Sequence, residues 1–477
     1  MRRFLTLLGT TLLLSAVLCV GASASDYDAV AEDLSEIGMF RGTANGFELD
    51  RAPTRSEAAI MLVRLYGAEE EAAAAYEAGE ISHPFTDVGE TAAPYVAYIY
   101  TNGITNGTSA TTFGTGACTA QNYVVFLLRA LGYEDGTDFQ YADALTFAQE
   151  KGFYNPLMFS GTFLRDDLAA VTYQALGTDL KDGSTYLLKS LIDAGAVDAD
   201  AAASMTEKIE AYRALLDASS EMDTSAAMDA DMTADIEMTY TGETTESMTM
   251  GMTGNVQMAV TEDDIQMAYV FDINAMGETM TMGEWMRDGW VYIQTETGGE
   301  TVQTKTQVNT AEMQALLEQV QSTASMASPA NSADGLALVD SITVSTSGSN
   351  TVYTLVISQN SISSVMNGLL SMLGTDAAGV DLTEVTAILN GLEFSDITAI
   401  YTVGSNGQLR DMQMQFSMTM GGDALGMPGE SLEMAFDMDI TVNAVGDAVT
   451  VDFPTNLDSF PEAPAETPAD VETTTAA

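Results

Sequence analysis

The sequence predicts an α + β protein with two unlike parts: an N-terminal all-α bundle of helical repeats and a C-terminal antiparallel β domain. Three observations lead to this prediction. A pattern of glycine and arginine repeats within the first 200 residues, and apolar residues alternate with polar ones through the second half. In addition, 46% of the residues are hydrophobic, which is enough for real cores. We expect the β part to be a curved sheet or half-barrel with a few helices.

The charge balance excludes several classes of function. Among 477 residues, 16 Lys and Arg stand against 69 Asp and Glu, a formal net charge of −53. Binding to nucleic acid is excluded because it depends on clustered Lys and Arg. One His and two Cys provide neither a zinc site nor a Cys–His catalytic pair. No two carboxylates stand out as an acid/base pair, so we expect no enzyme, no catalytic residue, no cofactor and no metal.

Residues 1–24 have the pattern of a secretory signal peptide. Arg2 and Arg3 precede the apolar stretch from Leu5 to Val20, and Ala22-Ser23-Ala24 is a cleavage site of small residues. Cleavage leaves Cys118 as a lone cysteine, expected as a buried apolar residue. No later segment predicts a membrane span, so we expect a secreted protein.

Three copies of a two-helix unit are predicted at residues 26–67, 85–132 and 139–177, within a domain of residues 25–200 that ends in a trailing helix. Four residues of copy one recur 65 positions later in copy two: Gly38, Gly42, Arg64 and Gly67 become Gly103, Gly107, Arg129 and Gly132. The third copy is weaker and keeps the helix from Arg165 to Gly177. Such units cannot bury their apolar faces alone, so we expect them to pack into one domain.

Two segments of these copies carry a family resemblance: APTRSEAAIMLVRLYG at 52–67 and FTDV…PYVAYIYTNGITNGTSATTF, which spans 85–113. They resemble the S-layer homology family. The resemblance implies a pseudo-threefold bundle whose grooves bind secondary cell-wall polysaccharide, often pyruvylated. It also implies that such grooves fix an exported protein to the bacterial cell surface.

The candidate binding residues follow from this resemblance: Thr54, Arg55, Glu57, Asp87 and Arg165. Thr54 and Glu57 also have the spacing of a capping box, which explains them without a ligand. A cap does not require the guanidinium of Arg55, which would lie at a helix start and could bind a carboxylate. The second copy has Ala120 at this position. We therefore expect wall binding through Arg55 and Arg165, with Ala120 marking a silent pocket.

The second half begins with a linking helix at 201–222 and continues as a β domain at 223–457. From residue 214 onward, 3 basic residues stand against 40 acidic ones. Of the 29 Met residues, 24 lie between Met222 and Met438. We interpret them as the apolar face of the strands, or alternatively as a deformable pocket for a hydrophobic ligand. A Cu(I) site is not favoured because no His or Cys accompanies them.

Strands are predicted at 228–240, 248–252, 265–272, 278–295, 341–358, 396–420 and 431–452, with helices near 309–326, 361–373 and 382–390. Three segments resemble the half-barrel family of exported lipid-carrying lipoproteins: EWMRDGWVYIQTETGGETVQTK (284–305), GQLRDMQMQFSM (407–418) and VTVDFPTN (449–456). That resemblance implies a curved sheet that can hold a lipid. The composition of residues 458–477 predicts a disordered tail.

The sequence as a whole predicts a non-catalytic exported protein, held to the cell wall by its repeats and displaying a β domain. The alternative is a carrier or sensor of hydrophobic small molecules or lipids, in which the repeats are only a tether.

Overall fold

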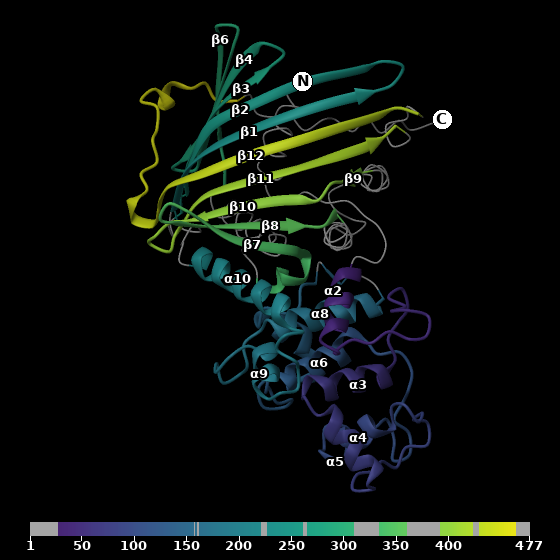
Figure 1. The fold of residues 1–477 in the computed structure, drawn as a ribbon. Coiled ribbons are helices and arrows are strands. Elements are labelled where there is room, and N and C mark those ends of the chain that lie inside the picture. Colours follow the sequence, from purple (N-terminus) through teal and green to yellow (C-terminus); the bar gives the residue numbers. More distant parts are fainter. Residues whose placement is uncertain are drawn as a thin grey trace, which may run out of the picture.

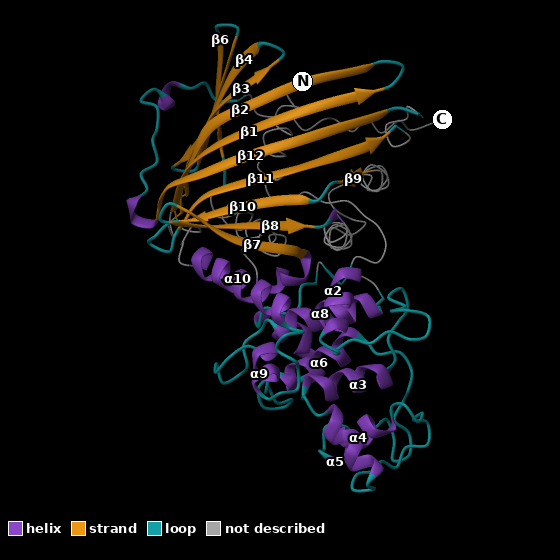
Figure 2. Ribbon diagram, viewed as in Figure 1, coloured by secondary structure: helices purple, strands orange, loops and turns teal. Residues whose placement is uncertain are grey.

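The computed structural model describes residues 27–156, 158–159, 162–220, 227–260, 265–309, 333–359, 392–422 and 429–463. Within them, the N-terminal part is helical and the C-terminal part is an open antiparallel sheet, which confirms the predicted fold class. Figures 1 and 2 show the helices gathered beside one edge of the sheet. The predicted signal peptide and the three helices expected from Thr310 to Met326, at 361–373 and at 382–390 lie outside the described residues.

No helix in the described ranges has the length and apolar content that crossing a lipid bilayer would require.

The described part of the helical region contains nine α-helices, and three of them begin where the repeat predicts. These second helices of the copies start at Arg55, Ala120 and Arg165. The bounds are α2 (Asp28–Glu36), α3 (Arg55–Leu65), α4 (Glu69–Glu77), α5 (Ala93–Thr101), α6 (Ala120–Ala130), α7 (Ala144–Glu150), α8 (Arg165–Leu176), α9 (Leu187–Asp193) and α10 (Ala203–Ser220). Their apolar faces pack into one core, in which the hydroxyls of Tyr123 and Thr172 join α6 to α8 at 2.7 Å.

The repeated arginines have the same role in copies one and two. Arg64 Nη1 donates to the carbonyl of Met39 at 2.8 Å, and Arg129 Nη1 donates to the carbonyl of Ile104 at 3.1 Å. Each acceptor follows a repeated glycine with positive φ, 72° at Gly38 and 71° at Gly103. The arginine therefore closes a turn that glycine makes possible, which explains why the two residue types recur together.

In the third copy, the position of the repeated arginine is occupied by a residue that contacts the β domain. Gln174 replaces the arginine, and its Oε1 accepts a hydrogen bond from the backbone N–H of Ala337 at 3.2 Å. Gly177 ends α8 with φ −85°, so it is not required for a left-handed turn. A Cβ at Gly177 would lie 2.7 Å from Leu336 Cδ2, so a larger residue here would force the Leu336 side chain to shift.

Both halves of the chain share one hydrophobic core at this contact. Leu336 and Ala337 belong to the 3-10 helix η3 (Ala333–Leu338), which precedes strand β7 (Val339–Ser347). They are buried with residues of α8 and α10. Helix α10, the predicted linking helix, contacts both η3 and β7. It is therefore part of the interface and not only a connection.

The described strands form one antiparallel sheet of twelve strands. Their order is β6-β5-β4-β3-β2-β1-β12-β11-β10-β8-β7, and β9 pairs with β11. The other bounds are β1 (Ala227–Thr241), β2 (Thr245–Val260), β3 (Ile265–Ala275), β4 (Glu278–Arg287), β5 (Trp290–Thr297), β6 (Glu300–Gln307), β8 (Asn350–Ile357), β9 (Leu392–Phe394), β10 (Ile397–Val403), β11 (Leu409–Gly421) and β12 (Ser431–Val445). The predicted strand at 278–295 is a hairpin, because Asp288 and Gly289 have φ of 52° and 73° and form a tight turn.

Alternation gives the sheet an apolar face and an acidic face. Across the apolar face, Ala234 of β1 lies between Met252 of β2 and Met438 of β12, and these three are buried together with Val256 and Phe271. On the other face, acidic side chains are paired with amides. Asn255 Nδ2, for example, donates to carboxylate oxygens of Asp229 and Asp231, both at 2.9 Å. The Met-rich strands thus place their thioethers on the apolar face, as the alternation predicts.

The end of the described chain is packed, although disorder is expected from residue 458 onward. Phe460 is 2% exposed, and its ring centroid lies 6.4 Å from that of Trp285 and 6.0 Å from that of Tyr292. Backbone hydrogen bonds of 2.8 Å then join Lys305 of β6 to Pro461 and Ala463. The polar composition of this segment gave no sign that Phe460 would be buried. The packed part of the chain therefore extends beyond residue 458.

Candidate functional site

The loop that precedes α3 is joined by backbone hydrogen bonds to the segment before α6 and to the start of α8. Thr54 forms a bridge with Ala117, and the Arg55 N–H donates to the carbonyl of Gly116 at 2.9 Å, which joins copies one and two. The Arg165 N–H donates to the carbonyl of Arg51 at 2.9 Å, which joins copies three and one. Residues distant in sequence are thereby brought to one place, as the repeat predicts.

Thr54 and Glu57 form the predicted capping box at the start of α3. The Thr54 side chain accepts from the Glu57 N–H at 3.2 Å, and Glu57 Oε2 accepts from the Thr54 N–H at 2.7 Å. Glu57 also binds Arg51, with Oε1 to Nη2 at 2.6 Å and Oε2 to Nη1 at 3.1 Å. Arg51 was not singled out from the sequence. It lies six residues before Glu57 at a position where copy two has Gly116, so the repeat gave no signal for it.

Arg165 completes this cluster and is an internal residue. Its Nη1 donates to Glu57 Oε1 at 2.7 Å and its Nε to the carbonyl of Phe47 at 2.8 Å, while the guanidinium lies 4.8 Å from the centroid of the Phe40 ring. The side chain is only 4% exposed. From the sequence we expected Arg165 at the mouth of a groove. In the structure its charge forms an ion pair with Glu57, which joins α8 to α3.

The charges of the cluster explain the ionisation of Glu57. Burial would raise the pKa of its carboxyl, but hydrogen bonds from Arg51 and Thr54 and the charge of Arg165 lower this pKa to about 2. Glu57 is therefore ionised and fully engaged with protein groups. Thr54 and Glu57 thus have the structural role of a capping box.

Asp87 holds a neighbouring loop in place. Its two carboxylate oxygens accept from the backbone N–H groups of Phe113 at 2.8 Å and Gly114 at 2.9 Å. These hydrogen bonds lower the pKa of Asp87. Asp87 thus fixes the loop that carries Phe113, which lies beside the start of α3.

Arg55 is the candidate residue whose charge stays available. Its guanidinium carbon lies 5.3 Å from the centroid of the Phe113 ring. The side chain is half-buried, and its Nε has no hydrogen-bond partner among the described residues. No carboxylate of the described chain forms an ion pair with it, whereas Arg41, Arg51, Arg64, Arg129 and Arg165 all have such pairs. An oriented, partly desolvated and unpaired cation is suited to an anionic ligand.

The corresponding position of copy two is neutral. Ala120 begins α6, and the next residues, Gln121 and Asn122, contact Tyr141. Tyr141 lies in the 3-10 helix η1 (Tyr141–Asp143), and its side chain is 45% exposed. From the sequence, the position of Ala120 showed only that an arginine is missing. The contacts of Gln121 and Asn122 could not be predicted, because their partner Tyr141 belongs to copy three.

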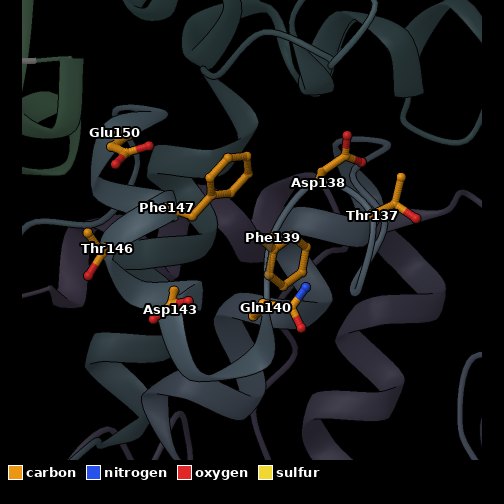
Figure 3. A pocket seen from close by; sticks show the side chains of 8 residues that line it. All are labelled: Thr137, Asp138, Phe139, Gln140, Asp143, Thr146, Phe147 and Glu150. Atoms are coloured by element: carbon orange, nitrogen blue, oxygen red, sulfur yellow. The ribbon is translucent and has the colours of Figure 1, made fainter.

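A small hollow lies beside η1, with a volume of about 300 Å³. Figure 3 shows its two aromatic rings, Phe139 and Phe147, which stack with centroids 5.5 Å apart. Gln140 and Asp143, the neighbours of Tyr141 in the chain, also line it. The hollow is thus formed by α7 and by the segment that precedes it.

Comparison with known proteins locates two families in this chain. The sequence model of the S-layer homology domain matches residues 84–117, which contain Asp87 and Phe113, and it confirms the resemblance seen there. Such a domain indicates attachment to the cell wall through wall polysaccharide. No curated protein matches the chain.

One matching solved structure is a putative outer membrane lipoprotein-sorting protein domain from Vibrio parahaemolyticus. The match has 8% sequence identity and a TM-score of 0.12, and it covers 52% of this chain and 94% of that one. The second family model matches residues 209–456, from α10 to the end of the sheet and beyond, which is more than half of the chain. The chain therefore belongs to DUF6612, a family of unknown function.

Proposed function

We propose that this chain is a non-catalytic, exported bacterial surface protein whose helical domain holds it to the wall by binding an acidic group of secondary cell-wall polysaccharide at Arg55. The observation that carries this proposal is the unpaired guanidinium of Arg55 beside Phe113. The carboxylate of a pyruvyl ketal has the charge and planar shape that a guanidinium binds with two parallel hydrogen bonds.

Three features favour Arg55 as the contact. The N–H bond to Gly116 and the ring of Phe113 hold the residue at the junction of copies one and two. Asp87 in turn fixes the Phe113 loop. Because these groups are already in place, little conformational entropy is lost when a ligand binds.

The net charge of −53 would repel an acidic polymer at long range. Salt screens this repulsion beyond about 8–10 Å, so the contact at Arg55 dominates at close range. Binding should accordingly be weak in dilute buffer and stronger at physiological ionic strength.

The test is retention of the full chain on purified cell wall that carries its polysaccharide. Arg55→Ala should weaken binding by about ten- to hundredfold, the usual cost of losing a charge-assisted hydrogen-bonded pair. Arg41→Ala is the matched control, because Arg41 is an exposed arginine of the same bundle whose charge is paired with Glu69 at 2.9 Å. Equal retention of Arg55→Ala and the unaltered chain would refute the assignment.

A second function is proposed for the β domain: binding of a hydrophobic small molecule or lipid. The observation that favours it is the composition of the apolar face, where Met252 and Met438 pack with Phe271. Thioether side chains adapt to ligands of varied shape. Native mass spectrometry of the full chain purified from cells should then show a bound apolar molecule, and Met252→Glu should release it. A ligand-free spectrum would contradict this second proposal.

A further inference from the structure

A carboxylate, that of Glu284 in β4, lies within the apolar face of the sheet. Side chains alternate along a strand, so Met282 and Met286 point to the same side of the sheet as Glu284. Its partners across the neighbouring strands are Tyr269 of β3 and Ile293 of β5. Side chains in such opposite positions have their Cβ atoms about 4.5–5.5 Å apart. The carboxylate of Glu284 is thus surrounded by two methionines, an aromatic ring and an isoleucine.

Tyr269 joins the surroundings of Glu284 to the rest of the apolar face. Its ring packs against the cluster that contains Met252 and against a second cluster that contains Met267 and Met286. Met286 is 1% exposed. The hydroxyl of Tyr269 donates to Met267 Sδ at 3.2 Å, so its one proton is not available to the carboxylate.

Glu284 has no partner within the part of the chain that the structure describes. It forms neither a hydrogen bond nor an ion pair there, and its side chain is half-buried. Burial raises the pKa of its carboxyl. Burial and, after it, the charge of Glu284 raise the pKa of Tyr269 to about 12. The charged form of Glu284 is therefore unfavourable where it stands.

The β domain has no further cation that could pair with Glu284. From residue 214 onward, the sequence contains only Arg287, Lys305 and Arg410 as basic residues and no His, and this count includes the segments that the structure does not describe. Arg287 and Lys305 belong to the opposite face, where Arg287 pairs with Asp458 at 3.0 Å and Lys305 Nζ lies 5.3 Å from the centroid of the Trp290 ring. Arg410 begins β11, five strands away from β4.

The helical bundle lies on the other side of the sheet from Glu284. Strand β4 is the third from one edge, whereas α10 contacts β7, which forms the other edge (Figure 1). An ionisable group without a partner in apolar surroundings lowers the stability of a protein, and such groups are concentrated at functional sites. A partner from outside the chain would remove this penalty.

We propose that the apolar face binds a small amphiphile that carries one protonated amine, with its apolar body on Met282 and Met286 and its ammonium group on Glu284. This inference rests on the second proposed function, the binding of a hydrophobic molecule, and it names the class of that molecule. Charge complementarity decides the class. Ammonium N–H groups form strong, charge-assisted hydrogen bonds with a carboxylate in apolar surroundings, whereas a fatty acid would bring a second negative charge.

The experiment measures the affinity of the full chain for three probes with the same alkyl chain: dodecylamine, dodecanol and dodecanoate, each below its micelle concentration. Isothermal titration calorimetry at physiological salt provides the dissociation constants. The unaltered chain should bind dodecylamine at least about tenfold more tightly than dodecanol, and dodecanoate most weakly. Glu284→Gln keeps the shape of the side chain and should abolish the preference for the amine, while its affinity for dodecanol stays the same.

Glu237→Gln is the matched control, because Glu237 is an exposed glutamate of β1 on the acidic face. It removes the same charge from the chain without changing the apolar face, so the preference for dodecylamine should remain. In the absence of a probe, Glu284→Gln should melt at the same temperature as the unaltered chain or higher, since it loses a carboxylate that has no partner. A lower melting temperature would overturn the inference, because it would show that Glu284 is paired within the chain.

The binding outcomes separate this inference from the function on which it rests. Equal affinities for the amine and the alcohol, or a preference that Glu284→Gln retains, overturn the amine site and leave the binding of hydrophobic molecules intact. A preference lost in Glu237→Gln as well overturns it too, because the overall negative charge would then attract the amine. If none of the three probes binds, both the amine site and the second proposed function are wrong.

Discussion

Replacing Glu57 by Gln tests the claim that one carboxylate holds the starts of α3 and α8 together. In the structure, Glu57 accepts hydrogen bonds from Thr54, Arg51 and Arg165, the last at 2.7 Å. A glutamine keeps the shape of the side chain and can still cap the helix. It removes the charge that balances two guanidinium groups.

The expected loss of stability can be worked in two ways from the same contacts. Lowering the pKa of Glu57 from its usual 4.5 to about 2 corresponds to about 3 kcal/mol in favour of the folded state. Breaking a buried ion pair by removing one partner costs about 3–5 kcal/mol, and Arg165 is 4% exposed. We expect Glu57→Gln to lower the free energy of unfolding by about 3–5 kcal/mol.

Urea unfolding of the full chain, followed by the helical circular-dichroism signal, measures this loss. A cycle with Arg165→Met and the double variant should give an interaction free energy of at least about 1 kcal/mol, since the two side chains act as a pair. Glu70→Gln, at an exposed position of α4, is the control and should stay within about 0.5 kcal/mol of the unaltered chain.

The pH dependence gives a separate check. Because the folded state lowers the pKa of Glu57, the stabilisation is complete above pH 4.5 and is lost as the pH falls towards 2. Glu57→Gln should lack this part of the acid profile. Strictly additive effects in the cycle, together with an unchanged acid profile, would refute the account of the cluster.

Further predictions concern the interface, the end of the chain and the loop under Arg55. Gly177→Ala should weaken the contact between the two halves and lower the melting temperature, because its Cβ would lie 2.7 Å from Leu336 Cδ2; a melt unchanged from the original would contradict this. Phe460→Ala should cost about 3–5 kcal/mol and shift the Trp285 fluorescence to longer wavelength, as expected when a buried ring is removed. Asp87→Ala should release the loop and weaken wall binding in the same direction as Arg55→Ala, with the helical content kept; retention equal to the original would show that the loop has no part in binding.

Much of the architecture followed from local patterns. The starts of α3, α6 and α8 could be predicted because caps and glycine turns are encoded within a few residues. The strands could be predicted because alternation has a period of two, although the pattern did not show where Asp288 and Gly289 turn the chain back.

The site was harder to predict because its partners come from different copies. A capping box lies within four residues, so the roles of Thr54 and Glu57 could be read from the sequence. That Arg165 would reach Glu57 depends on how copies one and three pack, which no local pattern contains. The resemblance therefore assigned equal roles to Arg55 and Arg165, although Arg55 is half-buried and Arg165 is buried in an ion pair with Glu57.

The same limit applies to Gln174. Gln174 stands where copies one and two have an arginine, and from the sequence the third copy was only a weaker one. In the structure Gln174 accepts a hydrogen bond from the N–H of Ala337, three residues before the close approach of Gly177 to Leu336. A repeat copy that departs from the common pattern can thus be suited to a contact with another part of the chain. Here that contact is with η3, which the pattern of the repeat does not include.

The shared core of α8, α10 and η3 has a mechanical consequence. A protein fixed to an envelope is pulled by flow and by contact with other surfaces. Here such a force would pass from the sheet to the bundle through packed side chains and not along a flexible linker. The sheet would accordingly keep one orientation towards the envelope, always presenting the same side to the surroundings.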